Sequence, residues 1–156
     1  MLSVGITLVQ LLAISLISLI AGGTFAIWQG YDPHAYSPAT FVEVHQSAVR
    51  GLNVLLPAIA MAGLALTAAL AIISRNRPVV SGLYVIAIAG FVVGGVITRF
   101  ANQPINAQVM TWTADAMPSD WTAIRDTWWH WHIVRTIVSM LTELTLILAV
   151  FSHRNV

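Results

Sequence analysis

Four long apolar runs limit what this chain can fold into. They occupy about residues 4–26, 52–73, 79–96 and 133–151, and each can cross a hydrocarbon core of about 30 Å as a helix. A lipid-exposed backbone must satisfy its own hydrogen bonds, so each run is predicted to be α-helical. Because 58% of the residues are hydrophobic and only 8% are charged, we expect an all-α bundle of four transmembrane helices, a single integral membrane domain over residues 1–156.

The distribution of arginine predicts how the bundle is oriented. The chain contains no lysine, and Arg75, Arg77 and Arg154 lie beside the ends of apolar runs. Positively charged connections tend to remain in the cytoplasm. We therefore expect a multi-pass protein of the bacterial inner membrane with both termini in the cytoplasm. The two long connections, residues 28–50 and 99–132, would then lie on the outer side.

Capping signals predict that the second and fourth helices begin before the membrane. Ser37 followed by Pro38 is typical of a helix N-terminus, and Ser119 can cap the fourth helix in the same way. A helix over residues 38–73 would be about 54 Å long at 1.5 Å per residue. Both helices should therefore extend beyond the membrane on the outer side.

Two prolines are expected to interrupt the helical pattern. Pro57 cannot donate to the carbonyl of Asn53, so a kink is predicted there that opens a small polar pocket. Asn102-Gln103-Pro104 has the composition of a turn and is expected to end the third helix.

Small and aromatic residues suggest how the bundle meets its surroundings. Gly90 and Gly94 form a GxxxG pair, which allows close helix packing either within the chain or in a homo-oligomer. All six tryptophans fall in the predicted outer half, where each is expected to anchor the protein in the lipid bilayer at headgroup level.

Polar residues recur on one face of the fourth helix, which is expected to point into the bundle. They follow one another at spacings of three and four: Trp128, His132, Arg135, Ser139, Thr142 and Glu143. Ionisable residues inside a membrane usually serve a function. Further polar residues are expected at the same depth from the second and third helices: Glu43, His45, Asn53, Arg99, Asn102 and Asn106.

Four motifs occur in a fixed order along the chain. They are His45-Gln46 leading through Asn53 to Pro57, then Asn102-x-Pro104-Ile105-Asn106, then Trp121 with Arg125, and then Trp128-x-x-x-His132-x-x-Arg135-Thr136. Over nearly its whole length the sequence thereby resembles the anthrone oxygenase-like family of small four-helix membrane proteins. The resemblance implies oxidation of a polyketide anthrone to an anthraquinone by molecular oxygen, with no cofactor expected.

That chemistry requires a base and a group that stabilises an anion. Loss of a proton from an anthrone gives an enolate that can pass an electron to oxygen. His132 is the expected base, and Arg135, one turn away, is expected to stabilise the enolate oxygen. The other expected catalytic residues are His45 and Asn106. A lipophilic aromatic substrate is expected to bind through Trp128, Asn53, Asn102 and Arg99.

Two other classes of function remain open. A metal or haem site for copper or iron would draw on His45, His130, His132 and Glu43, although His130 and His132 are two residues apart and point to different sides of a helix. Alternatively, the polar face only fixes the bundle of an accessory subunit or a binding protein for a lipophilic molecule. Nucleic-acid binding has no support in the sequence, because there is no basic patch.

Overall fold

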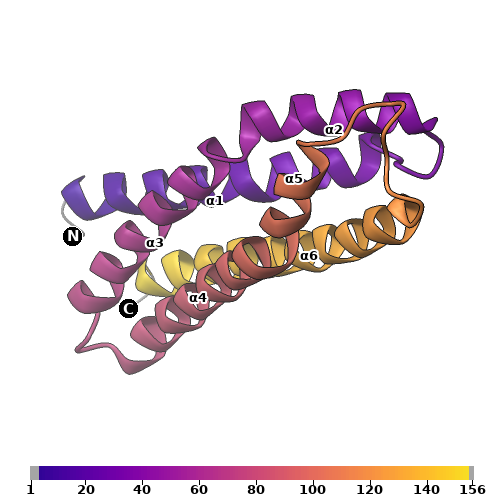
Figure 1. Cartoon of the computed structure of the whole chain (residues 1–156). Coiled ribbons are helices and arrows are strands. Elements are labelled where there is room, and N and C mark those ends of the chain that lie inside the picture. Colours follow the sequence, from indigo (N-terminus) through magenta and orange to yellow (C-terminus); the bar gives the residue numbers. More distant parts are fainter. Residues whose placement is uncertain (1–3, 155–156) are drawn as a thin grey trace.

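The computed structural model describes residues 4–154, which are mostly helical and contain no β-strand. The elements are α1 (Val4–Gly30), α2 (Pro38–Leu52), α3 (Leu55–Ile73), α4 (Pro78–Ile97), the π-helical turn η1 (Thr98–Asn102), α5 (Gln103–Val109) and α6 (Trp121–Arg154). Four continuous stretches are long and apolar enough to cross a membrane: α1, α2 with α3, α4 with η1 and α5, and α6. They form the bundle in Figure 1, which confirms the predicted all-α four-helix fold of a multi-pass membrane protein.

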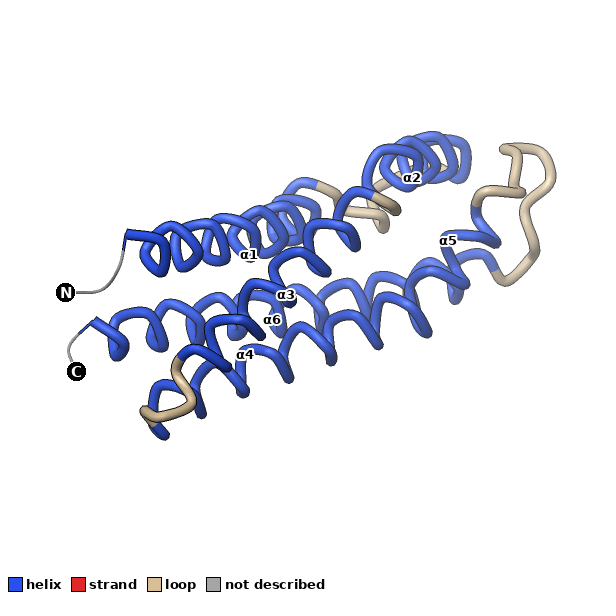
Figure 2. Tube along the Cα trace, turned by 90° about the vertical axis from the view of Figure 1, so that its left-hand side faces the viewer, coloured by secondary structure: helices blue, strands red, loops and turns tan. Residues whose placement is uncertain are grey.

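The two ends of the bundle differ in their connections. The start of α1, the turn between α3 and α4, and the end of α6 lie together at one end, whereas the two longer loops lie at the other (Figure 2). The chain termini, which the sequence predicts to be cytoplasmic, lie outside the described residues. The predicted extensions of the second and fourth helices, α2 and the first turns of α6, lie at the end with the long loops.

Buried polar side chains join the helices at the end that carries the short turn. The hydroxyls of Ser74 and Tyr84 lie 3.3 and 3.4 Å from Nδ1 of His153, and Gln10 donates to the Tyr84 hydroxyl over 3.2 Å. Arg77 donates to the carbonyl of His153 over 3.0 Å. These bonds connect α1, α3, α4 and α6 far from the second polar region, which is described below.

The predicted kink at Asn53 is present. Helix α2 ends at Leu52, Asn53 caps it, and α3 begins at Leu55. Pro57 explains the break, because it has no N–H to donate and its ring crowds the carbonyl four residues earlier. The chain changes direction between α2 and α3 as a result (Figure 1).

The prediction that a turn at Asn102-Gln103-Pro104 ends the third helix is wrong. The third stretch continues through η1 into α5 and ends at Val109. Pro104 lies in the first turn of α5, and η1 immediately precedes it. A π-helical turn bonds each carbonyl to the residue five further along, so it absorbs the proline without ending the helix.

The expectation that every tryptophan is a headgroup anchor is wrong for two of them. Trp112 and Trp128 are only 6% exposed and belong to an aromatic core between α2, α5 and α6. Phe41 and Tyr31 belong to the same core. Both rings pack against other aromatic rings inside the protein. The indole N–H of Trp128 donates a hydrogen bond within the protein, so it does not need a headgroup partner.

The GxxxG glycines serve packing within the chain. A Cβ added to Gly90 would collide with the side chain of Thr142 on α6, and one added to Gly94 would touch Val138 at 3.9 Å. Gly82, on the same helix, has open space where its Cβ would be. The absence of a side chain at Gly90 therefore sets how closely α4 and α6 approach.

Replacing Gly90 with alanine should consequently destabilise the bundle, by about 1–3 kcal/mol, because an overpacked contact must shift. Unfolding in mixed detergent micelles, followed by circular dichroism, measures this change. The matched substitution Gly82→Ala should leave stability unchanged or raise it by up to about 1 kcal/mol through helix propensity. Equal behaviour of the two variants would contradict the packing role of Gly90.

Candidate functional site

A cavity of about 320 Å³ lies inside the bundle between α1, the α2–α3 kink, α4 with η1, and α6. This volume is in the range typical of small-molecule sites. Most of its wall is aliphatic, but one end is lined by five polar or aromatic side chains, Tyr31, His45, Asn53, Asn106 and Trp128. We call these five residues the polar cluster. The kink contributes Asn53 to the polar end of this cavity, so polar groups lie where the sequence predicts a pocket, but the cavity as a whole is mostly apolar.

Hydrogen bonds run through the polar cluster from one side to the other. The Tyr31 hydroxyl lies 3.3 Å from Nδ1 of His45, and Nε2 of His45 lies 3.2 Å from Oδ1 of Asn106. The Asn106 amide nitrogen then donates to Oδ1 of Asn53 over 3.0 Å. Residues from the α1–α2 loop, α2, α5 and the kink are therefore joined in one network.

Trp128 determines which way this network is polarised. Its indole Nε1 can only donate, and it donates to Oδ1 of Asn106 over 2.8 Å. That contact fixes the orientation of the Asn106 amide, so the facing Nε2 of His45 must also be a donor. Nδ1 of His45 consequently carries the lone pair and accepts from Tyr31.

Tyr31 suits the role of donor. Burial, reinforced by the neighbouring Tyr36, raises the pKa of the Tyr31 phenol well above its usual range. The phenol thus stays protonated at physiological pH. Tyr31 is not among the site residues predicted from the sequence, because it belongs to no helix face. The fold brings the Tyr31 ring to 5.8 Å from the Trp128 ring, measured between centroids, although the two residues are far apart in the sequence.

His132 and Arg135 form a second unit beside the polar cluster. Nε2 of His132 lies 3.0 Å from the Thr24 carbonyl and must donate to it, while Nδ1 accepts from the Arg135 guanidinium over 2.9 Å. The His132 imidazole is fully buried and stacks on the rings of Trp128 and Trp129. Arg135 lines the cavity, whereas His132 lies behind it.

Other predicted binding residues occupy different positions around the cavity. Arg99 lines it from η1, with its guanidinium 5.8 Å from the Phe100 ring. Asn102 is fully buried behind the wall and donates to the Trp128 carbonyl over 3.1 Å. Glu143 also lies outside the lining, where its Oε1 accepts from the Ser18 hydroxyl.

Two further motif residues hold the surroundings of the site in place. Gln46 donates to the carbonyls of Val109 and Trp112, both over 3.0 Å, and so ties α2 to the end of α5. The Arg125 guanidinium lies 5.1 Å from the Trp121 ring at the start of α6. Both motif residues therefore make structural contacts outside the cavity lining.

The residues considered for a metal site do not gather in one place. Within residues 4–154 no three His, Cys, Asp or Glu side chains are grouped so that they could hold a metal ion. Glu43 and His130 are exposed on α2 and α6. His45 and His132 each have both ring nitrogens hydrogen-bonded to other groups of the protein.

The charged side chains that line the cavity are all arginines. Arg99 and Arg135 line it, and its described lining contains neither Asp nor Glu. In the part of the chain that the structure describes, no carboxylate forms an ion pair with either arginine. A guanidinium removed from water without a counter-charge is costly. The site therefore favours a ligand that is, or becomes, negatively charged.

Comparison with known families identifies the family of the chain. The family model described as anthrone oxygenase matches residues 45–144, well over half of the chain. The match begins at His45 and includes Asn106, Trp128, His132 and Arg135. Comparisons with curated proteins and with solved structures gave no significant match. The chain belongs to the anthrone oxygenase family.

Proposed function

We propose that this protein is a membrane oxygenase that oxidises a lipophilic, anthrone-like polycyclic molecule with molecular oxygen and without a bound cofactor. The observation that carries the proposal is the cavity, where the imidazole of His45 and the guanidinium of Arg135 face a largely aliphatic space, and no described carboxylate pairs with that guanidinium. An anthrone is a carbon acid, and its reaction with oxygen needs a base and a stabilised enolate. The family name points to the same reaction.

His45 is the proposed base. Only the Tyr31 hydroxyl occupies its Nδ1 lone pair, over a long 3.3 Å contact, and a hydroxyl can rotate away when substrate arrives. The Nε2–H of His45 stays on Asn106, which supports the imidazolium that forms. Nδ1 of His132 is held by Arg135 and lies behind the wall. The geometry thus favours His45 as base and His132 as the residue that positions Arg135.

The reaction balances with oxygen as the only co-substrate. His45 takes a proton from the carbon opposite the ketone, and the remaining electron pair forms an enolate whose oxygen accepts from Arg135. The enolate gives one electron to oxygen, and the resulting substrate radical and superoxide combine at that carbon. The peroxide then receives the proton from His45 and loses water, which leaves the second carbonyl of the quinone.

The same proposal includes an orientation in the membrane. The α3–α4 turn carries Arg75 and Arg77, so it should face the cytoplasm. The polar cluster, at the end with the long loops, then lies near the outer leaflet. Cysteine accessibility from either side of sealed vesicles tests this orientation, and the native chain has no cysteine to interfere.

Oxygen uptake by the purified, chelator-washed protein tests the proposed reaction. With an anthrone as substrate we expect one oxygen molecule consumed for each anthraquinone formed, at a rate independent of residual metal or haem content. Turnover that rises in proportion to the metal or haem that copurifies with the protein would contradict the cofactor-free reaction. Binding of the anthrone without turnover above the buffer rate would instead indicate a binding protein.

A further inference from the structure

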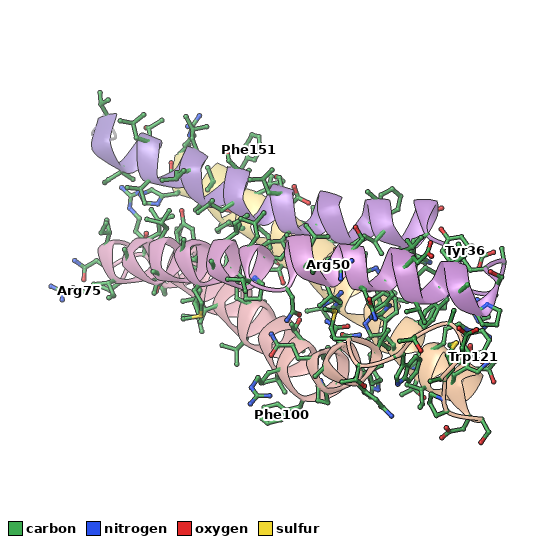
Figure 3. The ribbon with its side chains drawn as sticks, turned by 45° about the horizontal axis from the view of Figure 1, so that its top comes forward. Tyr36, Arg50, Arg75, Phe100, Trp121 and Phe151 are labelled. Carbon is green, nitrogen blue, oxygen red and sulfur yellow. The ribbon has the colours of Figure 1, made fainter. Side chains whose placement is uncertain are left out.

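The cavity reaches the outside of the bundle between α3 and α4. Met61 on α3 and Gly95 on α4 both line the cavity and are exposed, Met61 to 64%. Arg99, one turn beyond Gly95, is also exposed and also lines the cavity. Figure 3 shows α3 and α4 separating between their common turn, marked by Arg75, and the region of Phe100. We call this opening the lateral opening.

The depth of the lateral opening follows from helix length. At 1.5 Å per residue, Met61 lies about 21 Å along α3 from Arg75, and Gly95 lies about 27 Å along α4 from Arg77. Arg99 lies about 33 Å from Arg77, roughly one hydrocarbon thickness away. The opening therefore runs from the hydrocarbon region at Met61 to headgroup level at Arg99.

The chemistry of the lateral opening changes along this depth. Its hydrocarbon end is formed by Met61 and Gly95, which carry no charge. Its headgroup end carries the Arg99 guanidinium, for which the described residues provide the Phe100 ring but no carboxylate. An apolar entrance with one unpaired cation at its edge matches an amphiphilic molecule with an anionic end.

We propose that the cavity is loaded sideways from the lipid and that its ligand is a lipophilic acid, whose rings enter between α3 and α4 and whose carboxylate or ionised phenol binds Arg99. This inference rests on the proposed function in that it treats the cavity as the substrate site. It adds the route of entry and an acidic group on the ligand. This group is distinct from the reacting carbon, whose enolate oxygen is proposed to bind Arg135. A phospholipid phosphate could offer Arg99 the same charge, and the test below separates the two.

Binding of two fluorescent probes tests the acidic group. The probes are anthracene-2-carboxylate and its uncharged methyl ester, added to protein in phosphatidylcholine nanodiscs and followed by energy transfer from tryptophan. Arg99→Gln should weaken binding of the carboxylate about ten- to hundredfold and leave the ester unchanged, as expected for one charge-assisted hydrogen bond. Arg50→Gln is the matched control, because Arg50 is exposed but does not line the cavity.

A second pair of variants tests the route of entry. Gly95 and Gly82 both lie on α4 with open space at Cβ, but only Gly95 lines the cavity. Gly95→Leu should fill the lateral opening and slow the uptake of both probes at least tenfold in stopped-flow mixing. Gly82→Leu should leave both uptake rates unchanged.

Three results would overturn the inference. Equal losses of acid and ester in Arg99→Gln would make Arg99 a structural residue. If the difference in acid binding between wild type and Arg99→Gln disappears in nanodiscs rich in anionic phospholipid, Arg99 is a lipid contact. Equal uptake rates in Gly95→Leu and Gly82→Leu would exclude entry between α3 and α4. Because these are binding measurements, absence of anthrone turnover would count against the proposed function alone.

Discussion

Replacing His45 with glutamine is expected to lower kcat for anthrone oxidation at least about 100-fold, within the range that general-base catalysis contributes. Glutamine can still donate to Asn106 and accept from Tyr31, so the polar cluster should keep its shape. It cannot take up a proton. The measurement is oxygen uptake under substrate saturation, with KM determined alongside, and KM should change by less than about threefold because binding contacts remain.

The matched control for this variant is His130→Gln. His130 lies on α6 near the same depth, but it is exposed and lies outside the cavity lining. Its replacement should leave kcat unchanged. Equal losses in the two histidine variants would show that His45 is not the base.

Tyr31→Phe separates two routes for the proton. If His45 takes the proton directly, losing a hydroxyl that only covers its Nδ1 should change kcat by less than about fivefold. A loss as large as that of His45→Gln would mean that the proton passes through the Tyr31 oxygen. The raised pKa of Tyr31 makes a spontaneous phenolate an unsuitable base near neutral pH.

Much of the fold could be predicted from local features of the sequence. Four apolar runs require four helices in lipid, and Pro57 requires a break at Asn53 because a proline cannot complete the helical hydrogen bond. The prediction that the third helix ends before Pro104 is wrong because a helix can accommodate a proline in two ways. It can end, or it can widen into a π-helical turn, and packing of η1 against α6 accompanies the second response here.

The candidate site was predictable to the level of a helix face and no further. Spacing places His132 and Arg135 on one side of α6, but it cannot distinguish a side chain that reaches the cavity from one that packs on a neighbouring helix. His132 bonds to the Thr24 carbonyl of α1, a contact between residues far apart in the chain. Tyr31 was missed for the related reason that a loop residue has no periodicity to indicate where it points.

Arg135 should matter to the reaction about as much as the base does. Arg135→Gln is expected to lower kcat about 100- to 1,000-fold, the loss typical when a donor to a developing oxyanion is removed from a dry site. Arg135→Lys should recover only part of this, since an ammonium keeps the charge but not the planar fork that can bond to His132 and to an oxyanion at the same time. Arg50→Gln, which removes an exposed guanidinium outside the cavity, should leave kcat unchanged.

The role of His132 can be read from a double-mutant cycle with Arg135. If His132 acts only by holding the guanidinium through Nδ1, His132→Ala should lower kcat less than Arg135→Gln does, and the double variant should be no slower than Arg135→Gln alone. Binding of the uncharged anthracene ester should stay within about twofold in all three, which separates positioning from collapse of the cavity. Additive losses in kcat would instead give His132 a chemical role of its own, as the base that its place in the sequence suggests.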